Sequence, residues 1–93
     1  MVRGQRTLER AARRMTLDLL HQRAAPATIC PSEVAKAVSA KTDQGATQIE
    51  WRILMPIIHL AIDALVSEGL VWLSWKGQSM SARSGPYRIG HPS

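Results

Sequence analysis

The residue types that most often carry catalysis or bind metals are few in this chain and widely separated. Its three histidines, His21, His59 and His91, do not form a metal-binding spacing with the single cysteine, Cys30. One cysteine also excludes an internal disulfide, and it is expected to serve as a small buried apolar residue. Because there is no glycine-rich phosphate-binding loop either, we expect neither an enzyme nor a metal or cofactor site.

The chemistry that the composition does favour is the binding of anions. The chain has 93 residues and a formal net charge of +5, and its two ends carry the basic excess. Residues 1–25 contain six arginines against Glu9 and Asp18, whereas residues 71–93 contain three basic side chains and no acidic one. A basic excess of this kind favours nucleic acid or another polyanion as the partner.

Nine side chains are candidates for contact with nucleic acid. They lie on the first helix, near the start of the central helix, and in the C-terminal hairpin region: Arg6, Arg10, Arg13, Lys41, Gln48, Arg52, Lys76, Arg83 and Arg88. The alternative is that the first-helix arginines only solvate one face of an amphipathic helix. Contact of this helix with a membrane surface is disfavoured, because its apolar side is rich in alanine and has no aromatic anchor.

Two further pairs of neighbouring residues could have either a functional role or an ordinary structural one. Trp75 beside Lys76 could stack on a base or sugar, or it could cover the edge of a sheet. Trp72 and Trp75 are expected on opposite faces of one strand, with one of them buried. His59 and Asp63 are one helical turn apart, which is consistent with a surface hydrogen bond or with a pH-sensitive contact.

The elements that position these side chains surround the longest apolar segment, residues 47–69. Thr47 and Glu50 have the spacing of a capping box, and Gly69 suits the left-handed residue that ends a helix. Pro56 predicts either a kink near Arg52 or two shorter helices that divide at the proline.

This central helix has two apolar rows. The first is expected to form the core, and its members are Leu54, Ile58, Ala61, Ile62 and Leu65. The second row either packs on the first helix, through Leu17 and Leu20, or forms a homodimer face. The members of the second row are Ile53, Ile57, Leu60 and Ala64.

The remaining pattern predicts one domain over residues 1–93, with loose tails at 1–5 and 90–93. Before the central helix we expect a helix over 6–24, a short strand over 27–30, a helix over 31–38 with Ser32 as N-cap, and a loop over 39–46. After it we expect strands over 70–75 and 86–89, joined by a polar connection over 76–85. A three-helix core with a small antiparallel corner predicts an α+β, mainly α, fold of the winged-helix type, with residues 76–85 as the wing.

Four motifs occur together in one order along the chain. They are Ser-Glu-Val-Ala at 32–35, Trp-Arg-x-Leu-Met-Pro at 51–56, Glu-Gly at 68–69 and Gly-Pro-Tyr-Arg-Ile at 85–89. Together they resemble a family of small bacterial proteins of unknown function whose fold is similar to the winged helix. The resemblance covers most of residues 8–89 and implies the fold, but neither an activity nor catalytic residues. It also implies that relatives have a basic residue near the position of His59 and acidic residues in the wing. The wing of this chain contains no acidic residue.

Two functions follow from these predictions. The first is DNA binding, in which the start of the central helix enters the major groove and the wing contacts phosphates, with weak, salt-sensitive affinity. The second is a protein-interaction or dimerisation module without nucleic-acid contact, since a fold does not determine a function. In either case we expect a cytoplasmic protein without a membrane partner, because no apolar run follows the basic N-terminus and the central helix is too polar to span a bilayer.

Overall fold

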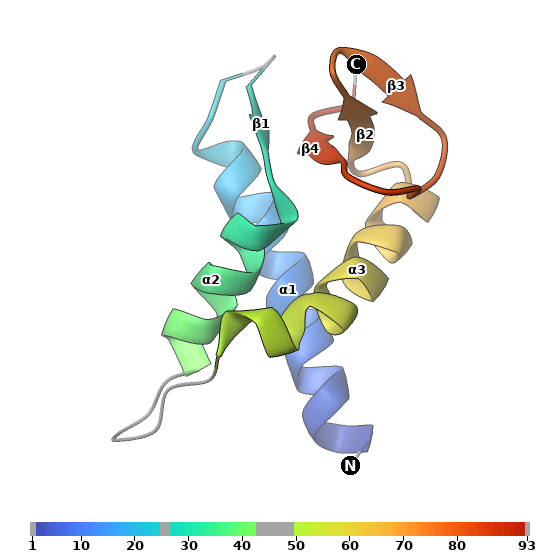
Figure 1. The fold of residues 1–93 in the computed structure, drawn as a ribbon. Helices are drawn as coiled ribbons and strands as arrows, with labels where there is room; N and C mark the ends of the chain where they lie inside the picture. Colours follow the sequence, from blue (N-terminus) through green and yellow to red (C-terminus); the bar gives the residue numbers. More distant parts are fainter. Residues whose placement is uncertain (1, 25–26, 43–49, 93) are drawn as a thin grey trace.

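In the computed structural model, three helices and a four-stranded antiparallel sheet form an α+β fold, as predicted (Figure 1). The structure describes residues 2–24, 27–42 and 50–92. The elements are α1 (Val2–His21), β1 (Thr28–Ile29), α2 (Pro31–Thr42), α3 (Trp51–Ser67), β2 (Trp72–Trp75), β3 (Gln78–Met80) and β4 (Arg88–Gly90). Each helix contacts the other two, and the sheet lies at one end of the helices (Figure 1).

The core forms where the apolar faces of the helices meet the inner face of the sheet. All five residues of the predicted core row of α3 are buried, so that prediction is confirmed. The helix α1 also contributes a buried side to the core. Its most buried positions are Ala12, Thr16 and Leu20. Thr16 can be buried because its hydroxyl donates to the Ala12 carbonyl oxygen at 2.7 Å.

The start of α3 differs from the predicted capping box. Glu50 has an extended backbone (φ −68°, ψ 120°) and is itself the N-cap, with its side chain accepting from the Arg52 backbone N–H. A glutamate that closes a capping box would instead have helical backbone angles, three residues into the helix. The predicted partner, Thr47, lies outside the described residues.

Pro56 lies inside a single helix, so the alternative of two helices divided at the proline is wrong. The helix α3 continues from Trp51 to Ser67, and its ribbon bends in its first half (Figure 1). The bend has a local cause, because proline cannot donate to the Arg52 carbonyl and its ring crowds that carbonyl.

The C-terminal end of α3 forms the motif that its glycine predicted. Gly69 has a φ of +74°. Its N–H bonds to the Val66 carbonyl, and the Leu70 N–H bonds to the Leu65 carbonyl, both at 3.0 Å. These two bonds define a Schellman motif, which satisfies carbonyls that a helix end would otherwise leave without partners.

Two helix boundaries correct the predictions. The helix α2 begins at Pro31 and runs four residues past the expected end, to Thr42. Its N-cap is therefore Cys30, not Ser32, and the Glu33 carboxylate accepts from the Cys30 N–H at 2.7 Å. Proline is favoured in the first helical position and glutamate in the third. The helix α1 begins at Val2 and ends at His21, so residues 2–5 are helical and not a loose tail.

The sheet has the strand order β1-β4-β2-β3. The short strand near residues 28–29 and the late strand that pairs with β2 were predicted, and Gly90, expected in a loose tail, belongs to β4. The connection 76–85 is more ordered than expected. Lys76 and Gly77 both have positive φ (53° and 81°) and form a two-residue turn into β3, which pairs with β2.

Candidate nucleic-acid interface

The three predicted arginines of α1 have two different environments. Arg6 and Arg10 are exposed. The Arg13 guanidinium instead donates to both Glu68 carboxylate oxygens, at 2.7 and 2.8 Å, and so connects α1 to the C-cap of α3. This contact lowers the pKa of Glu68. Because a two-pronged contact of this kind fixes the arginine, Arg13 belongs to the packing of the helices.

The candidates near the start of α3 provide little free charge. The Arg52 guanidinium bonds to the Glu50 carboxylate at 2.9 Å and lies 4.5 Å from the centre of the Trp51 ring. The ammonium group of Lys36, from α2, also lies over that ring, at 4.9 Å. The side chains of Lys41 and Gln48 lie outside the described residues.

In the segment between β3 and β4, Arg83 is also occupied. Its guanidinium donates to both carboxylate oxygens of Asp63 on α3, at 2.8 and 2.9 Å. The hydrogen bonds from Arg83 lower the pKa of Asp63. Arg83 therefore holds this segment against α3, whereas Lys76 in the turn between β2 and β3 is exposed.

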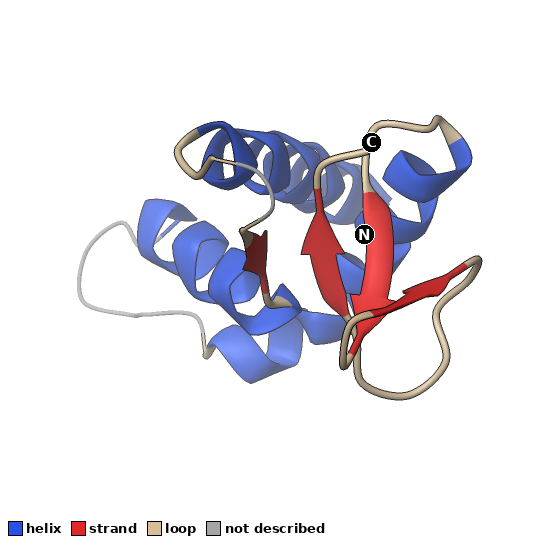
Figure 2. Ribbon diagram, turned by 90° about the horizontal axis from the view of Figure 1, so that it is seen from above, coloured by secondary structure: helices blue, strands red, loops and turns tan. Residues whose placement is uncertain are grey.

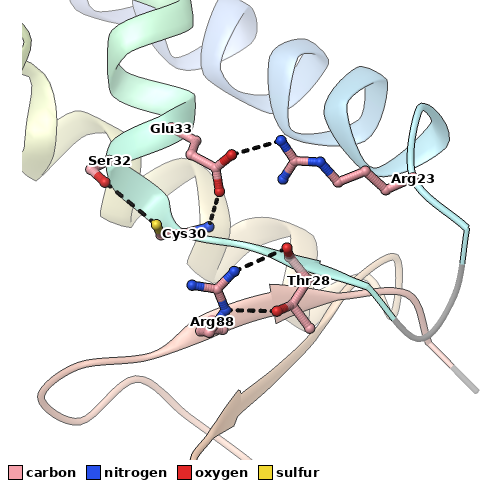
Figure 3. Close-up of polar contacts among 6 residues, drawn as sticks. All are labelled: Arg23, Thr28, Cys30, Ser32, Glu33 and Arg88. Atoms are coloured by element: carbon pink, nitrogen blue, oxygen red, sulfur yellow. Dashed lines mark hydrogen bonds and ion pairs between the residues drawn. The ribbon is translucent and has the colours of Figure 1, made fainter.

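Arg88 makes contacts of a different kind. Its guanidinium donates to the Thr28 hydroxyl at 2.6 Å and to the Thr28 carbonyl at 3.1 Å, which joins β4 to β1 (Figure 3). Both acceptors are neutral, and no carboxylate of the described residues forms an ion pair with Arg88. The guanidinium is thus held in place with its positive charge unpaired.

A neighbouring cluster stabilises the start of α2 without adding charge. Arg23, just after α1, donates to the Glu33 carboxylate at 2.7 Å, and the other Glu33 oxygen caps the helix at Cys30 (Figure 3). The Arg23 hydrogen bond, more than any other contact, lowers the pKa of Glu33. The sequence signal for the cap by Glu33 was the Pro-x-Glu spacing at 31–33, which is typical of a helix start.

Strand register defines the outward face of the sheet. Ile29, Ile89 and Leu73 are opposite one another and buried, so the adjacent rows of residues point to the other side. These outward rows consist of Thr28, Gly90 and Trp72, followed by Arg88, Ser74 and Ser79. Residues 69–93 contain no aspartate or glutamate. The outward face therefore combines an aromatic ring, hydroxyl groups and an unpaired guanidinium.

Both strand tryptophans are partly open to solvent, so the prediction that one of them is buried is wrong. Trp72 is 47% exposed and Trp75 is 39% exposed. Leu73 takes the buried position between them, and the residue opposite Trp72 is Gly90, which has no side chain to cover an indole. Trp72 also borders a groove of about 620 Å³ that Val66, Leu73 and Met80 help to line.

His59 bonds to a residue other than the predicted one. Its Nδ1 lies 2.6 Å from the Tyr87 hydroxyl, while Asp63 is occupied by Arg83. Burial, with a further contribution from Arg83, lowers the pKa of His59, and burial raises the pKa of Tyr87. The predicted hydrogen bond between His59 and Asp63 is therefore wrong, because Tyr87 reaches the imidazole from the segment that precedes β4.

The second apolar row of α3 is only partly covered. Ile53 is 71% exposed, Leu60 is 47% exposed, and Pro56 between them is exposed as well. Ile57 and Ala64 are half-buried, at the side of the helix nearer to the core. The outward side of α3 is thus apolar along its first half, where a helix that recognises the major groove would carry polar side chains.

The described residues form neither a metal-ligand cluster nor a membrane-spanning helix. Within residues 2–24, 27–42 and 50–92, no three histidine, cysteine, aspartate or glutamate side chains come together as metal ligands would. Among the same residues, no helix has both the length and the apolar character needed to span a bilayer.

Fold and surface together define a small α+β domain with a basic, aromatic sheet face. Comparison with protein families assigns the chain more closely. A family model described as a protein of unknown function (DUF3253) matches residues 9–92, and the chain belongs to this family. A comparison with curated proteins gives no match.

Proposed function

We propose that this chain is a winged-helix-like module that binds single-stranded nucleic acid on the outward face of its sheet. The winged-helix assignment is supported by the order of the elements: a short strand follows the first of three packed helices, and an antiparallel hairpin follows the third. The role is one of binding and not of catalysis, since the side chains on this face offer stacking and charge but no acid–base pair.

The observation that carries the proposal is the exposure of Trp72 on the same face of the sheet as Arg88. A nucleobase can stack on an indole ring whatever its sequence, and each such contact contributes about 1–3 kcal/mol. The guanidinium of Arg88 matches a phosphate group in charge and geometry, and its existing bonds to Thr28 hold it in place. Stacking and phosphate contact therefore occur on adjacent strands of one face.

The turn between β2 and β3 extends the same surface. Lys76 is exposed in this turn, and Ser74 and Ser79 lie on the outward face between the turn and Arg88. Serine hydroxyls can both donate to phosphate oxygens and accept from sugar hydroxyls. Because no carboxylate from residues 69–93 opposes these groups, the surface attracts a polyanion.

A single strand fits this surface better than a duplex does. Stacking on Trp72 requires a base whose face is accessible, and a paired base in a duplex does not offer its face. The alternative site for a duplex, the outward side of α3, presents Ile53 and Leu60 to solvent, and Arg52 there is paired with Glu50. The N-terminal half of α1, with Arg6 and Arg10, lies away from the sheet (Figure 1).

The test is fluorescence anisotropy with a labelled oligothymidylate and with a duplex of the same length, at low and at near-physiological salt. The proposal expects tighter binding of the single strand and an affinity that falls as the salt concentration rises. Absence of binding at low salt would overturn it, and so would a preference for the duplex.

A protein-interaction module is the second candidate, and one specific observation favours it. The most exposed large apolar side chain of the described residues is Ile53, and it lies on the outward side of α3 together with Pro56 and Leu60. A protein partner would cover such a row. This candidate uses a different surface from the sheet face, so the two functions are compatible.

A further inference from the structure

The exposed apolar residues of α3 form a straight row. Ile53, Pro56 and Leu60 are spaced by three and then four residues, which places them on one line along the helix. The row is short and is bounded at each end by a closed ion pair: Glu50 with Arg52 at the N-terminal end, and Asp63 with Arg83 at the C-terminal end. We call these three residues and their two flanking ion pairs the α3 ridge.

We propose that a second copy of this chain covers the α3 ridge, with the two α3 helices antiparallel. A two-fold axis between positions 56 and 57 places Ile53 of each copy against Leu60 of the other, so the same contact forms two times in the dimer. The prolines lie at the centre of the interface, next to each other. Seven residues, or two helical turns, separate Ile53 from Leu60, so one register satisfies both contacts.

The charges at the ends of the ridge are complementary only in this orientation. The two-fold axis brings the N-terminal end of the ridge, with Glu50 and Arg52, against the C-terminal end of the second copy's ridge, with its Asp63–Arg83 pair. Arg52 then approaches Asp63 of the second copy, and Arg83 approaches Glu50 of the second copy. A parallel pair would instead align identical charges along the whole helix. The antiparallel arrangement also opposes the two helix dipoles, which is the favourable alignment for neighbouring helices.

This inference is independent of the proposed nucleic-acid binding. It uses α3, whereas the nucleic-acid surface uses β2, β4 and the turn at Lys76. If both hold, the dimer presents two sheet faces, and a long single strand that reached both would gain affinity through effective concentration. Self-association without nucleic acid tests the dimer alone.

The first measurement is the mass of the wild-type chain by sedimentation equilibrium over a wide range of concentration. We expect the mass to rise from 10.3 kDa toward twice that value. A mass that stays at that of one chain up to millimolar concentration overturns the proposal, and this result depends on no variant.

The second measurement uses two substitutions that the antiparallel register makes complementary. Ile53→Glu and Leu60→Lys each bury an unpaired charge in the dimer, so each alone should weaken self-association by about tenfold or more. In an equimolar mixture the new carboxylate faces the new ammonium, and the other contact keeps its wild-type Ile–Leu pair, so dimers should return. Both positions are exposed in the single chain, at 71% and 47%, so the fold is retained, which circular dichroism verifies.

The control is Leu70→Lys, an apolar-to-lysine change at a side chain that is 43% exposed but lies outside the ridge. It should leave the dimer unchanged. Dimers that survive in either single variant would overturn the proposed face. A mixture that stays monomeric while the wild type dimerises would overturn the antiparallel register.

Discussion

At the scale of single residues, the packing of the sheet explains why about half of the Trp72 side chain is buried. It does not explain why the other half is exposed. The indole lies across from Gly90, and an aromatic side chain opposite a strand glycine commonly covers the bare backbone there. The remaining 47% of its surface faces solvent and contributes nothing to the stability of the isolated chain. A ligand that stacks on the ring would make use of that surface.

We predict that Trp72→Ala weakens binding of single-stranded nucleic acid by a factor of about 5 to 150, which is the loss of one stacked base. The matched control is Trp75→Ala. This residue is of the same type, on the same strand and similarly exposed, but it points to the opposite face. Anisotropy titrations should show a small effect for the control. Equal losses in the two variants would contradict the assignment of the binding face.

Protonation of His59 should destabilise the fold. Burial lowers its pKa below the ordinary value of 6.5, so the neutral imidazole contributes stability above that pH. This contribution is lost as the pH falls from about 6.5 toward the pKa of the folded state. Thermal unfolding from about pH 7.5 to about pH 5.5 should therefore show a declining midpoint, and His59→Gln should make the decline smaller. An unchanged pH dependence in the variant would show that His59 is not responsible.

At the scale of elements, local signals predicted α3 well. Its core row, its end at a left-handed glycine and the perturbing proline all follow from neighbours within a few residues, and the structure agrees with the first two in full. Local signals were less effective at helix starts. Glu50 and Glu33 each cap a helix, but both lie at positions different from those that the Ser and Thr spacing suggested.

Replacing Gly69 should destabilise the protein through the backbone alone. A Cβ at this position would meet no atom within 4 Å, so any loss reflects the positive φ and not a clash. We expect Gly69→Ala to lower the free energy of unfolding by about 1–2 kcal/mol. Gly69→Asn should lose less, because asparagine adopts this conformation more easily. Urea unfolding of the three proteins measures both differences. An alanine variant as stable as the wild type would contradict the motif.

The candidate site was harder to predict than the fold, for a physical reason. Arg13 meets Glu68 across 55 residues, Arg83 meets Asp63 across 20, and Arg88 meets Thr28 across 60. Charge and helical spacing identify basic side chains, but they do not reveal which ones the tertiary structure pairs. The strand β3 was missed because Gln78 and Ser79 have little strand preference, and its pairing with β2 depends on the turn at Lys76 and Gly77.

At the scale of the whole molecule, the net charge overstates the charge that is available to a partner. Arg13, Arg23, Arg52 and Arg83 all form ion pairs within the chain. Among the described residues, the side chains that still present positive charge near the sheet face are Arg88 and Lys76. Binding of nucleic acid should therefore involve few phosphates. Its affinity should fall less steeply with salt concentration than the net charge of the chain alone would suggest.

This expectation can be tested with two lysines. Lys76→Ala should reduce the slope of log affinity against log salt by about 0.7, the value for one phosphate contact on a single strand. Lys36→Ala removes the same charge from an exposed lysine that lies over Trp51, at the start of α3, and should leave the slope unchanged. Equal slopes for both variants would mean that only the total charge matters and that the turn makes no phosphate contact.

The position of β4 in the sheet has a consequence for how the chain folds. Seen from above, β4 lies between β1 and β2 (Figure 2), and β1 pairs with no other strand of the described residues. The helices can pack together and the β2–β3 hairpin can close before residues 88–90 pair with β1. The first strand must wait for a segment about sixty residues later. Closing so long a loop is slow, so the pairing of β1 with β4 is a late step of folding, and the surface proposed to bind nucleic acid is complete only after that step.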